Sequence, residues 1–185
     1  MAVTATRHVE AVPYFYRWVA EEVGRPAAVA GSAGSAAVAA VSAAAARARA
    51  GDEMRAREFL SKLEHDRIMH ALREAEAKTS GEIRVYIQRG KLKTDPLIAA
   101  QTKFRRLGMD KTRERNAVLI FVAPRAHKFA VVGDKAIHEK CGEKFWQQVV
   151  DQMRAHFQSE RFSRAIVEAL VEIGEILAAH FPKKS

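Results

Sequence analysis

The chain has 185 residues, 48% of them hydrophobic and 29% charged, which is long enough for one compact domain with a buried core. Its formal net charge is +9, and its single cysteine, Cys141, excludes an internal disulfide, so the fold needs no oxidising compartment. The N-terminus lacks the pattern of a secretory signal, and the longest uncharged segment, residues 26–46, is too rich in alanine for a membrane helix. We therefore expect a soluble, cytoplasmic protein.

The positive charge is unevenly distributed along the chain. Residues 1–53 hold five basic and five acidic side chains, so the whole excess lies in residues 54–185. Such a surface attracts anions, among them acidic proteins, anionic lipid and nucleic acid. The simpler interpretation is a solvated basic surface, because no short stretch is densely basic. The absence of a recognition-helix pattern or an aromatic-interleaved basic strand argues against nucleic acid.

The N-terminal third differs in composition from the rest. Residues 26–50 are low-complexity sequence rich in alanine, serine, glycine and arginine, which is typical of a disordered or only partly helical segment. The aromatic cluster before it could form a short amphipathic helix that docks on the domain, on a partner or on a membrane surface; otherwise it is a disordered tail. That cluster consists of Tyr14, Phe15, Tyr16, Trp18 and Val19.

Two start sites are open to the protein, Met1 and Met54. We favour Met54, because the sequence that follows it, MRAREFL, is an ordinary start for the compact part. The predicted organisation is therefore an N-terminal extension over residues 1–53 and a folded domain over residues 54–185.

Regular periodicity begins after this extension. Ser61 and Glu64 form a capping box that places the start of a helix at Ser61, and the apolar stripe of this helix ends before Thr79–Gly81. Residues 82–88 then alternate between apolar and polar side chains. This alternation predicts a strand with one more polar face.

A second helix and a hairpin follow. Asp95–Pro96 supplies a cap and a proline at the first helical position, and Gly108 ends this helix. After a polar loop, the apolar run 117–123 turns at Pro124–Arg125 and returns through residues 129–132. The pattern predicts a buried β-hairpin whose two ends bring polar groups together.

Further helices complete the chain. A short helical turn reaches Gly142, and apolar stripes over residues 145–157 and 162–181 predict two longer helices, the second ended by Pro182. The helical crossover makes the first two strands parallel neighbours, whereas the hairpin strands are antiparallel. The predicted fold class is α/β, with a small mixed β-sheet sandwiched between helices and a disordered or partly helical N-terminal extension.

Polar residues at the ends of the predicted strands form the candidate binding site. Ligands bind at such edges of open α/β sheets. Carboxylate and amide oxygens suit Ca²⁺ or Mg²⁺, and a metal bound there could hold a phosphate. The structural alternative, which spacing alone favours, is that Asp134 caps the next helix and Glu114 pairs with a neighbouring arginine in solvent. The candidates are Glu82, Glu114, Arg115, Asn116 and Asp134, of which Glu114, Asn116 and Asp134 are the candidate metal ligands.

Motifs for other chemistry are absent from the sequence. No glycine-rich phosphate loop lies between a strand and a helix, and no serine occupies a nucleophile elbow. His138 and Cys141 have a spacing that puts both on one helical face, but two ligands without a second pair favour packing over a zinc site. No catalytic residue can be assigned on these grounds.

In combination, several segments of the chain resemble the TPM domain family. This family includes thylakoid proteins of photosystem II repair and many bacterial proteins of unassigned role. The resemblance covers residues 56–182 and implies a mixed four-element sheet between helices. The segments, in chain order, are SGEIRVYI (residues 80–87), GMDKTRERNAVLIFVAPRAHKFAVVGD (residues 108–134), IHEKCGEKFW (residues 137–146) and the terminal LAAHFP.

The resemblance also suggests functions. Plant members are associated with acid phosphatase activity and with calcium binding at acidic residues around the sheet end. Where secreted bacterial members tend to have Asp-Asn-Gly before the central strand, this chain has Arg115–Asn116–Ala117, and a cation there repels a divalent metal. We therefore favour a non-catalytic TPM-like interaction or assembly module with an acidic protein partner. The alternative is a phosphatase that depends on Ca²⁺ or Mg²⁺ and acts on phosphomonoesters.

Overall fold

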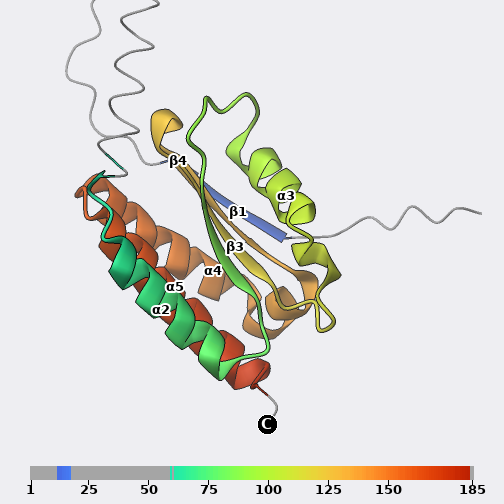
Figure 1. Cartoon of the computed structure of the whole chain (residues 1–185). Coiled ribbons are helices and arrows are strands. Elements are labelled where there is room, and N and C mark those ends of the chain that lie inside the picture. Colours follow the sequence, from blue (N-terminus) through green and yellow to red (C-terminus); the bar gives the residue numbers. More distant parts are fainter. Residues whose placement is uncertain (1–11, 18–58, 60, 184–185) are drawn as a thin grey trace, which may run out of the picture.

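A four-stranded mixed sheet organises the protein. The computed structural model describes residues 12–17 as backbone, together with residues 59 and 61–183 (Figure 1). The sheet order is β1-β4-β3-β2; β2 and β3 are parallel, and β4 is antiparallel to both β3 and β1. The strands are β1 (Val12–Arg17), β2 (Ile83–Ile87), β3 (Val118–Ala123) and β4 (Lys128–Gly133).

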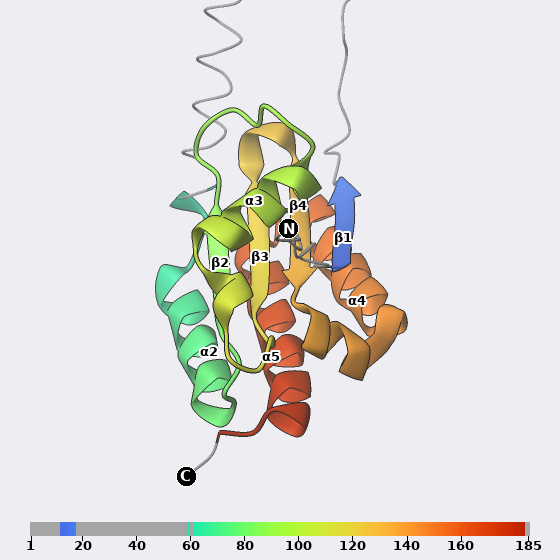
Figure 2. The ribbon, with the colours of Figure 1, turned by 90° about the vertical axis from the view of Figure 1, so that its right-hand side faces the viewer.

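Helices cover both faces of this sheet. Helix α3 lies on one face, and α2, α4 and α5 form a layer on the other, in which α5 packs against both α2 and α4 (Figures 1 and 2). No helix within residues 61–183 combines the length and the apolar character needed to cross a membrane. The helices are α2 (His65–Lys78), α3 (Pro96–Arg106), α4 (Lys135–Gln158) and α5 (Phe162–His180).

Strand β3 is buried over its whole length because it has helices on both sides. Successive side chains of a strand point to opposite faces. Val118, Ile120 and Val122 join the core beneath α2, α4 and α5. Leu119 and Phe121 face the other way and pack with residues of α3. A continuous apolar run is the sequence pattern that burial on both faces requires.

The predicted fold class, a small mixed sheet between helices, is confirmed. The parallel pairing of β2 with β3 and the hairpin of β3 with β4 are also as expected, with the turn formed by a short 3₁₀ helix at Pro124–Ala126. The start of α3 agrees with the prediction as well, because the Asp95 side chain accepts a hydrogen bond from the Leu97 N–H at 2.9 Å.

The predicted start of the first helix is wrong. Helix α2 begins at His65, four residues after Ser61, and no side chain caps it. The Glu64 N–H instead donates to the hydroxyl of Ser163, on α5, at 2.8 Å. A tertiary contact has therefore replaced the local capping box.

Gly142 divides α4 as the sequence suggests. Its φ of 70° and ψ of 177° are non-helical, and they separate a short N-terminal piece of α4 from the long remainder. A positive φ favours glycine, which has no Cβ to clash with the backbone. The predicted short helix and its successor thus form one element with a kink.

The aromatic cluster near the N-terminus forms neither of the two predicted alternatives, a short helix or a disordered tail, over the residues that the structure describes. Residues 12–17 are strand β1, which pairs along the whole of β4 from Val12 opposite Gly133 to Arg17 opposite Lys128. Trp18, Val19 and the low-complexity segment lie outside the described residues. The division into residues 1–53 and 54–185, and the choice between Met1 and Met54, stay predictions.

Candidate functional site

The ends of three strands meet where the sequence predicts a site. Glu114, Arg115 and Asn116 precede β3, and Asp134 follows β4, which is antiparallel to β3. The hairpin therefore places Asp134 beside the loop before β3, and the Asp134 N–H donates to the Ala117 carbonyl at 2.9 Å. This edge holds the N-terminal ends of the parallel strands β2 and β3, whereas ligands of open α/β sheets bind beyond the C-terminal ends.

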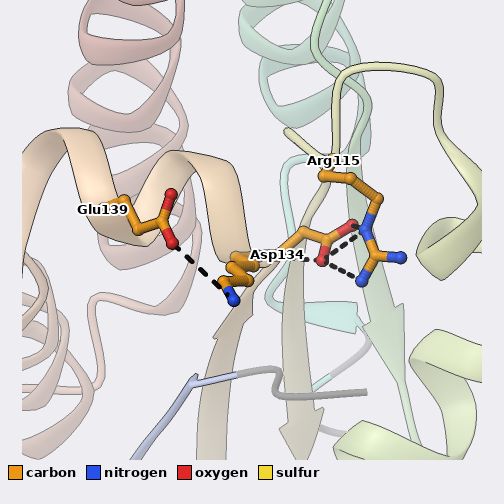
Figure 3. A network of polar contacts seen from close by, with 4 residues as sticks. Arg115, Asp134 and Glu139 are labelled. Carbon is orange, nitrogen blue, oxygen red and sulfur yellow. Dashed lines mark hydrogen bonds and ion pairs between the residues drawn. The ribbon is translucent and has the colours of Figure 1, made fainter. Parts of the chain in front are cut away.

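The centre of the cluster is an ion pair between Arg115 and Asp134 (Figure 3). The Arg115 Nε donates to both carboxylate oxygens, at 3.1 and 2.9 Å, and its Nη2 donates to Oδ1 at 2.9 Å. The Asp134 side chain is 0% exposed, whereas that of Arg115 is 40% exposed. This forked geometry is the strongest form of arginine–carboxylate pairing.

Backbone contacts hold the pair in place. Asp134 is the N-cap of α4, and its Oδ1 also accepts from the Lys135 N–H at 2.8 Å. Arg115 has a positive φ of 54°, and its carbonyl accepts from the Ala136 N–H at 3.1 Å. Lys135 pairs with Glu139 at 3.9 Å, one turn along α4 (Figure 3). The loop before β3 is thereby tied to the start of α4.

A second group of polar side chains lies beside this pair. Asn116 is buried, and its Nδ2 donates to Ser80 Oγ at 3.2 Å and to Glu114 Oε2 at 3.4 Å. The Ser80 hydroxyl also donates to Glu114 Oε2. Sequence reasoning missed Ser80 as a member of the site and treated it as part of a helix end. Its signal was its position, since it stands three residues before β2 and two residues before Glu82.

Glu82 does not join the other four predicted residues. Its carboxylate pairs with Arg84 on the edge strand β2, at 2.5 Å. Its backbone carbonyl accepts from the Val118 N–H at 2.8 Å, which fixes the start of the β2–β3 pairing. The structure therefore brings together Glu114, Arg115, Asn116 and Asp134, adds Ser80, and leaves the Glu82 side chain outside.

Comparisons with known proteins identify the domain. The family model described as the TPM domain matches residues 54–176. The chain belongs to the TPM domain family. The fold is similar to that in the NMR structure of the BA42 protein from the psychrophilic bacterium Bizionia argentinensis, with a TM-score of 0.61 and 33% sequence identity over 66% of this chain and 86% of that one. No curated protein matches the chain.

The polar cluster of this TPM domain does not fit a divalent metal as it is arranged. Both oxygens of Asp134 accept hydrogen bonds from Arg115, and Glu114 Oε2 accepts from Ser80 and Asn116. A cation close to Asp134 would also face the guanidinium, and like charges repel at such range. Within the described part of the chain, no three histidine, cysteine, aspartate or glutamate side chains are grouped so that they could hold a metal ion.

Cys141 has a structural environment. Its thiol donates to the Ile137 carbonyl at 2.9 Å and packs against the core beneath α4. Burial raises the pKa of the Cys141 thiol from 9.0 to about 11. A protonated thiol is neither a good nucleophile nor a good metal ligand. Packing is therefore the better interpretation of the His138–Cys141 spacing in this TPM domain.

Proposed function

We propose that this TPM domain is a non-catalytic interaction or assembly module. The observation that carries the proposal is the internal pairing of Asp134. This buried carboxylate, the best candidate for a metal ligand or an acid–base group, is satisfied by Arg115 and by the N-terminus of α4. A buried carboxylate held in this way joins the loop before β3 to α4 and acts as a structural tie.

Among the described residues, the hydroxyl of the cluster also lacks the usual partner of a serine nucleophile. Ser80 supplies a hydroxyl, but its hydrogen-bond partner is the carboxylate of Glu114. The usual activating partner of a serine nucleophile is a histidine or lysine base within hydrogen-bond reach. In the part of the chain that the structure describes, the Ser80 hydroxyl contacts the Glu114 carboxylate, the Asn116 amide and the Phe181 carbonyl, and none of these is a histidine or a lysine.

The alternative function is a phosphatase that depends on Ca²⁺ or Mg²⁺ and acts on phosphomonoesters. In that case Glu114, Asn116 and Asp134 would hold the cation, and Arg115 would steer the phosphate. Arg115 would first have to release Asp134, because its Nε and Nη2 both donate to that carboxylate. The two functions therefore differ in whether a cation can displace the guanidinium.

Metal titration of the full chain tests the proposal. CaCl₂ and MgCl₂ are added to millimolar concentration, and the melting temperature and the hydrolysis of p-nitrophenyl phosphate are followed together. We expect the melting temperatures of the wild type and of Glu114→Gln each to stay constant as metal is added, with no hydrolysis above the buffer rate. Glu114→Gln is used because it removes a metal ligand while keeping the size of the side chain.

A metal-dependent change in melting temperature would contradict the proposal. A rise in melting temperature that saturates with Ca²⁺ or Mg²⁺ and disappears in Glu114→Gln would establish a cation site and overturn the proposal. Metal-dependent hydrolysis lost in the same variant would establish the phosphatase. Ligand binding to the folded state must raise the melting temperature, so the measurement does not depend on knowing the substrate.

A further inference from the structure

The excess positive charge of the described domain comes from one segment. Residues 84–115 contain ten basic and three acidic side chains. The rest of residues 61–183 contains thirteen basic and thirteen acidic side chains, so it is electrically balanced. The charge is therefore concentrated on the elements that this segment builds, which are most of β2, helix α3 and the loops on either side of α3.

Of these elements, α3 forms a helical layer of its own, and β2 is an edge strand of the sheet. Helix α3 covers the face of the sheet opposite to α2, α4 and α5 (Figure 2). Eight of the ten basic side chains are exposed, and only Lys103 and Arg115 are partly covered. We call this the α3 surface; its exposed basic residues are Arg84, Arg89, Lys91, Lys93, Arg105, Arg106, Lys111 and Arg113.

Few of these charges are neutralised within the domain. Arg84 pairs with Glu82, whereas the partly covered Lys103 lies over the ring of Tyr86 with its Nζ 3.9 Å from the ring centroid. In the part of the chain that the structure describes, Arg105 and Arg106 form no ion pair. A group of like charges without internal partners attracts an anion and repels itself, so an acidic partner would relieve that repulsion.

An apolar side chain stands within this basic surface. Ile98 is 54% exposed, and it is the only large hydrophobic residue of α3 that is exposed to this degree. Residues four and seven positions apart lie on the same side of a helix. Exposed Thr102 and Arg105 therefore follow Ile98 along the outer line of α3.

We propose that the α3 surface binds an acidic polypeptide segment of a partner protein, with Ile98 as its apolar anchor. This inference rests on the proposed function of an interaction module. An apolar centre with arginines around it is the usual composition of a protein–protein interface. Nucleic acid would use the charge alone, and one half-exposed isoleucine is too little apolar area for insertion into a membrane.

Binding to a defined acidic polymer tests the inference. The full chain is titrated in EDTA with a random copolymer of glutamate and tyrosine (4:1), which offers both carboxylates and apolar side chains, and with polyglutamate, which offers only carboxylates. We expect the copolymer to bind more tightly. Arg105→Glu/Arg106→Glu should weaken copolymer binding about ten-fold or more, and Ile98→Ser should weaken it about three- to five-fold while leaving polyglutamate unaffected.

A matched control separates location from total charge. Lys140 and Lys144 are exposed on α4, in the opposite helical layer, and Lys140→Glu/Lys144→Glu changes the net charge by the same amount. At 150 mM salt, which largely screens the long-range effect of net charge, this control should bind within about two-fold of the wild type. Arg105→Gln/Arg106→Gln, which avoids placing carboxylates at the end of α3, should show a smaller loss in the same direction.

Several results would overturn the inference. Equal losses in the α3 and α4 variants would show that only net charge matters, and an unchanged affinity in Ile98→Ser would remove the apolar anchor. Tighter binding to a duplex DNA or to phosphatidylglycerol vesicles, with the same dependence on Arg105 and Arg106, would assign the surface to nucleic acid or lipid instead. Because EDTA is present and the strand-end cluster is unchanged, none of these results bears on the metal titration that tests the proposed function.

Discussion

Arg115 occupies both carboxylate oxygens of Asp134, which would otherwise be available to a ligand at this strand end. It forms a forked pair with the fully buried Asp134, nineteen positions away. The sequence predicts that these residues gather, because hairpin ends come together. It does not predict the pair, since that depends on a positive φ at Arg115 and on the exact direction in which α4 leaves β4. Ser80 was missed for the same reason: its contacts come from the tertiary arrangement.

Removing the guanidinium should therefore destabilise the fold. We expect Arg115→Gln to lower the free energy of unfolding by about 2 kcal/mol, because the buried Asp134 carboxylate loses its charged partner; the partial exposure of Arg115 keeps the loss below that of a fully buried pair. Urea unfolding at pH 7 measures it.

Two further variants make this prediction specific. Arg113→Gln removes an exposed arginine from the same loop and should change stability by less than about 0.5 kcal/mol. Arg115→Lys keeps the charge but loses the fork, so it should recover only part of the loss. Equal stability in Arg115→Gln and Arg113→Gln would show that the ion pair contributes nothing.

At the scale of helices and strands, the predictions succeed where local sequence decides the structure. The alternation in β2, the continuous apolar run of β3 and the Asp95–Pro96 start of α3 are such cases. They fail where a distant element takes over. Ser163 on α5 satisfies the Glu64 N–H, so the capping box at Ser61 is not used. The aromatic residues Tyr14, Phe15 and Tyr16 were expected in a short helix or a disordered tail, but pairing with β4 decides their conformation.

The contact between α2 and α5 is close enough to test by adding one methyl group. A Cβ at Gly174 would lie 2.6 Å from the Ala75 Cβ and 3.1 Å from its Cα. We expect Gly174→Ala to lower stability by about 1–3 kcal/mol through this overlap, although alanine is the better helix former. Thermal unfolding measures the loss.

The double variant Gly174→Ala/Ala75→Gly provides the control. It removes the opposing methyl group, so its stability should exceed the sum expected from the two single variants by at least about 0.5 kcal/mol. Additive effects would mean that the two helices simply move apart when the methyl group is added.

The contacts of Glu168 on α5 predict a dependence on pH. Arg164 donates to Glu168 at 2.5 Å, and contacts with His156 at 2.6 Å and Gln152 at 2.8 Å add to it. These contacts, with Arg164 the largest cause, lower the pKa of Glu168 from 4.5 to about 2. A depressed carboxylate pKa stabilises the folded state above the unfolded value, so this contribution should be lost as the pH falls from 4.5 towards 2.

We expect Glu168→Gln to lose about 1–2 kcal/mol at pH 6 and to show a flatter decline of stability between pH 4.5 and 2.5 than the wild type. Urea midpoints across this range measure it. Glu175→Gln, a change of the same kind on the same helix, should keep the wild-type slope. A Glu168→Gln slope as steep as that of the wild type would show that other groups cause the acid sensitivity.

At the scale of the whole molecule, the fold determines where the basic side chains are concentrated. The sequence shows how many basic residues there are, but it does not show that the ten in residues 84–115 lie on α3, on the edge strand β2 and on the loops beside α3, whereas the rest of residues 61–183 is balanced. Periodicity and charge counts are local, whereas a surface is assembled by the fold. The proposed interaction surface therefore follows from the tertiary structure, and neither periodicity nor the family resemblance predicts it.

A second question at the scale of the whole molecule is whether the domain needs strand β1, which lies before Met54 and outside the family match. It pairs with the whole length of β4, from Gly133 to Lys128. Residues 54–185 alone would leave that edge open, and an open edge invites pairing with another chain. We expect this fragment to fold, to unfold at a lower urea concentration than the full chain, and to associate at micromolar concentration, as measured by analytical ultracentrifugation.

Proline substitutions in the full chain test whether β1 pairing is the cause. Pro13 has no N–H to donate, so the alternation of an antiparallel ladder places the donors that face β4 at Tyr14 and Tyr16. Tyr14→Pro should therefore reproduce the instability and association of the fragment, whereas Phe15→Pro, whose N–H faces away, should resemble the wild type. If Tyr14→Pro and the fragment were both monomeric and as stable as the full chain, β1 would be dispensable. A start at Met54 would then leave the domain complete, because α3 and the three helices opposite it would enclose the sheet without a fourth strand.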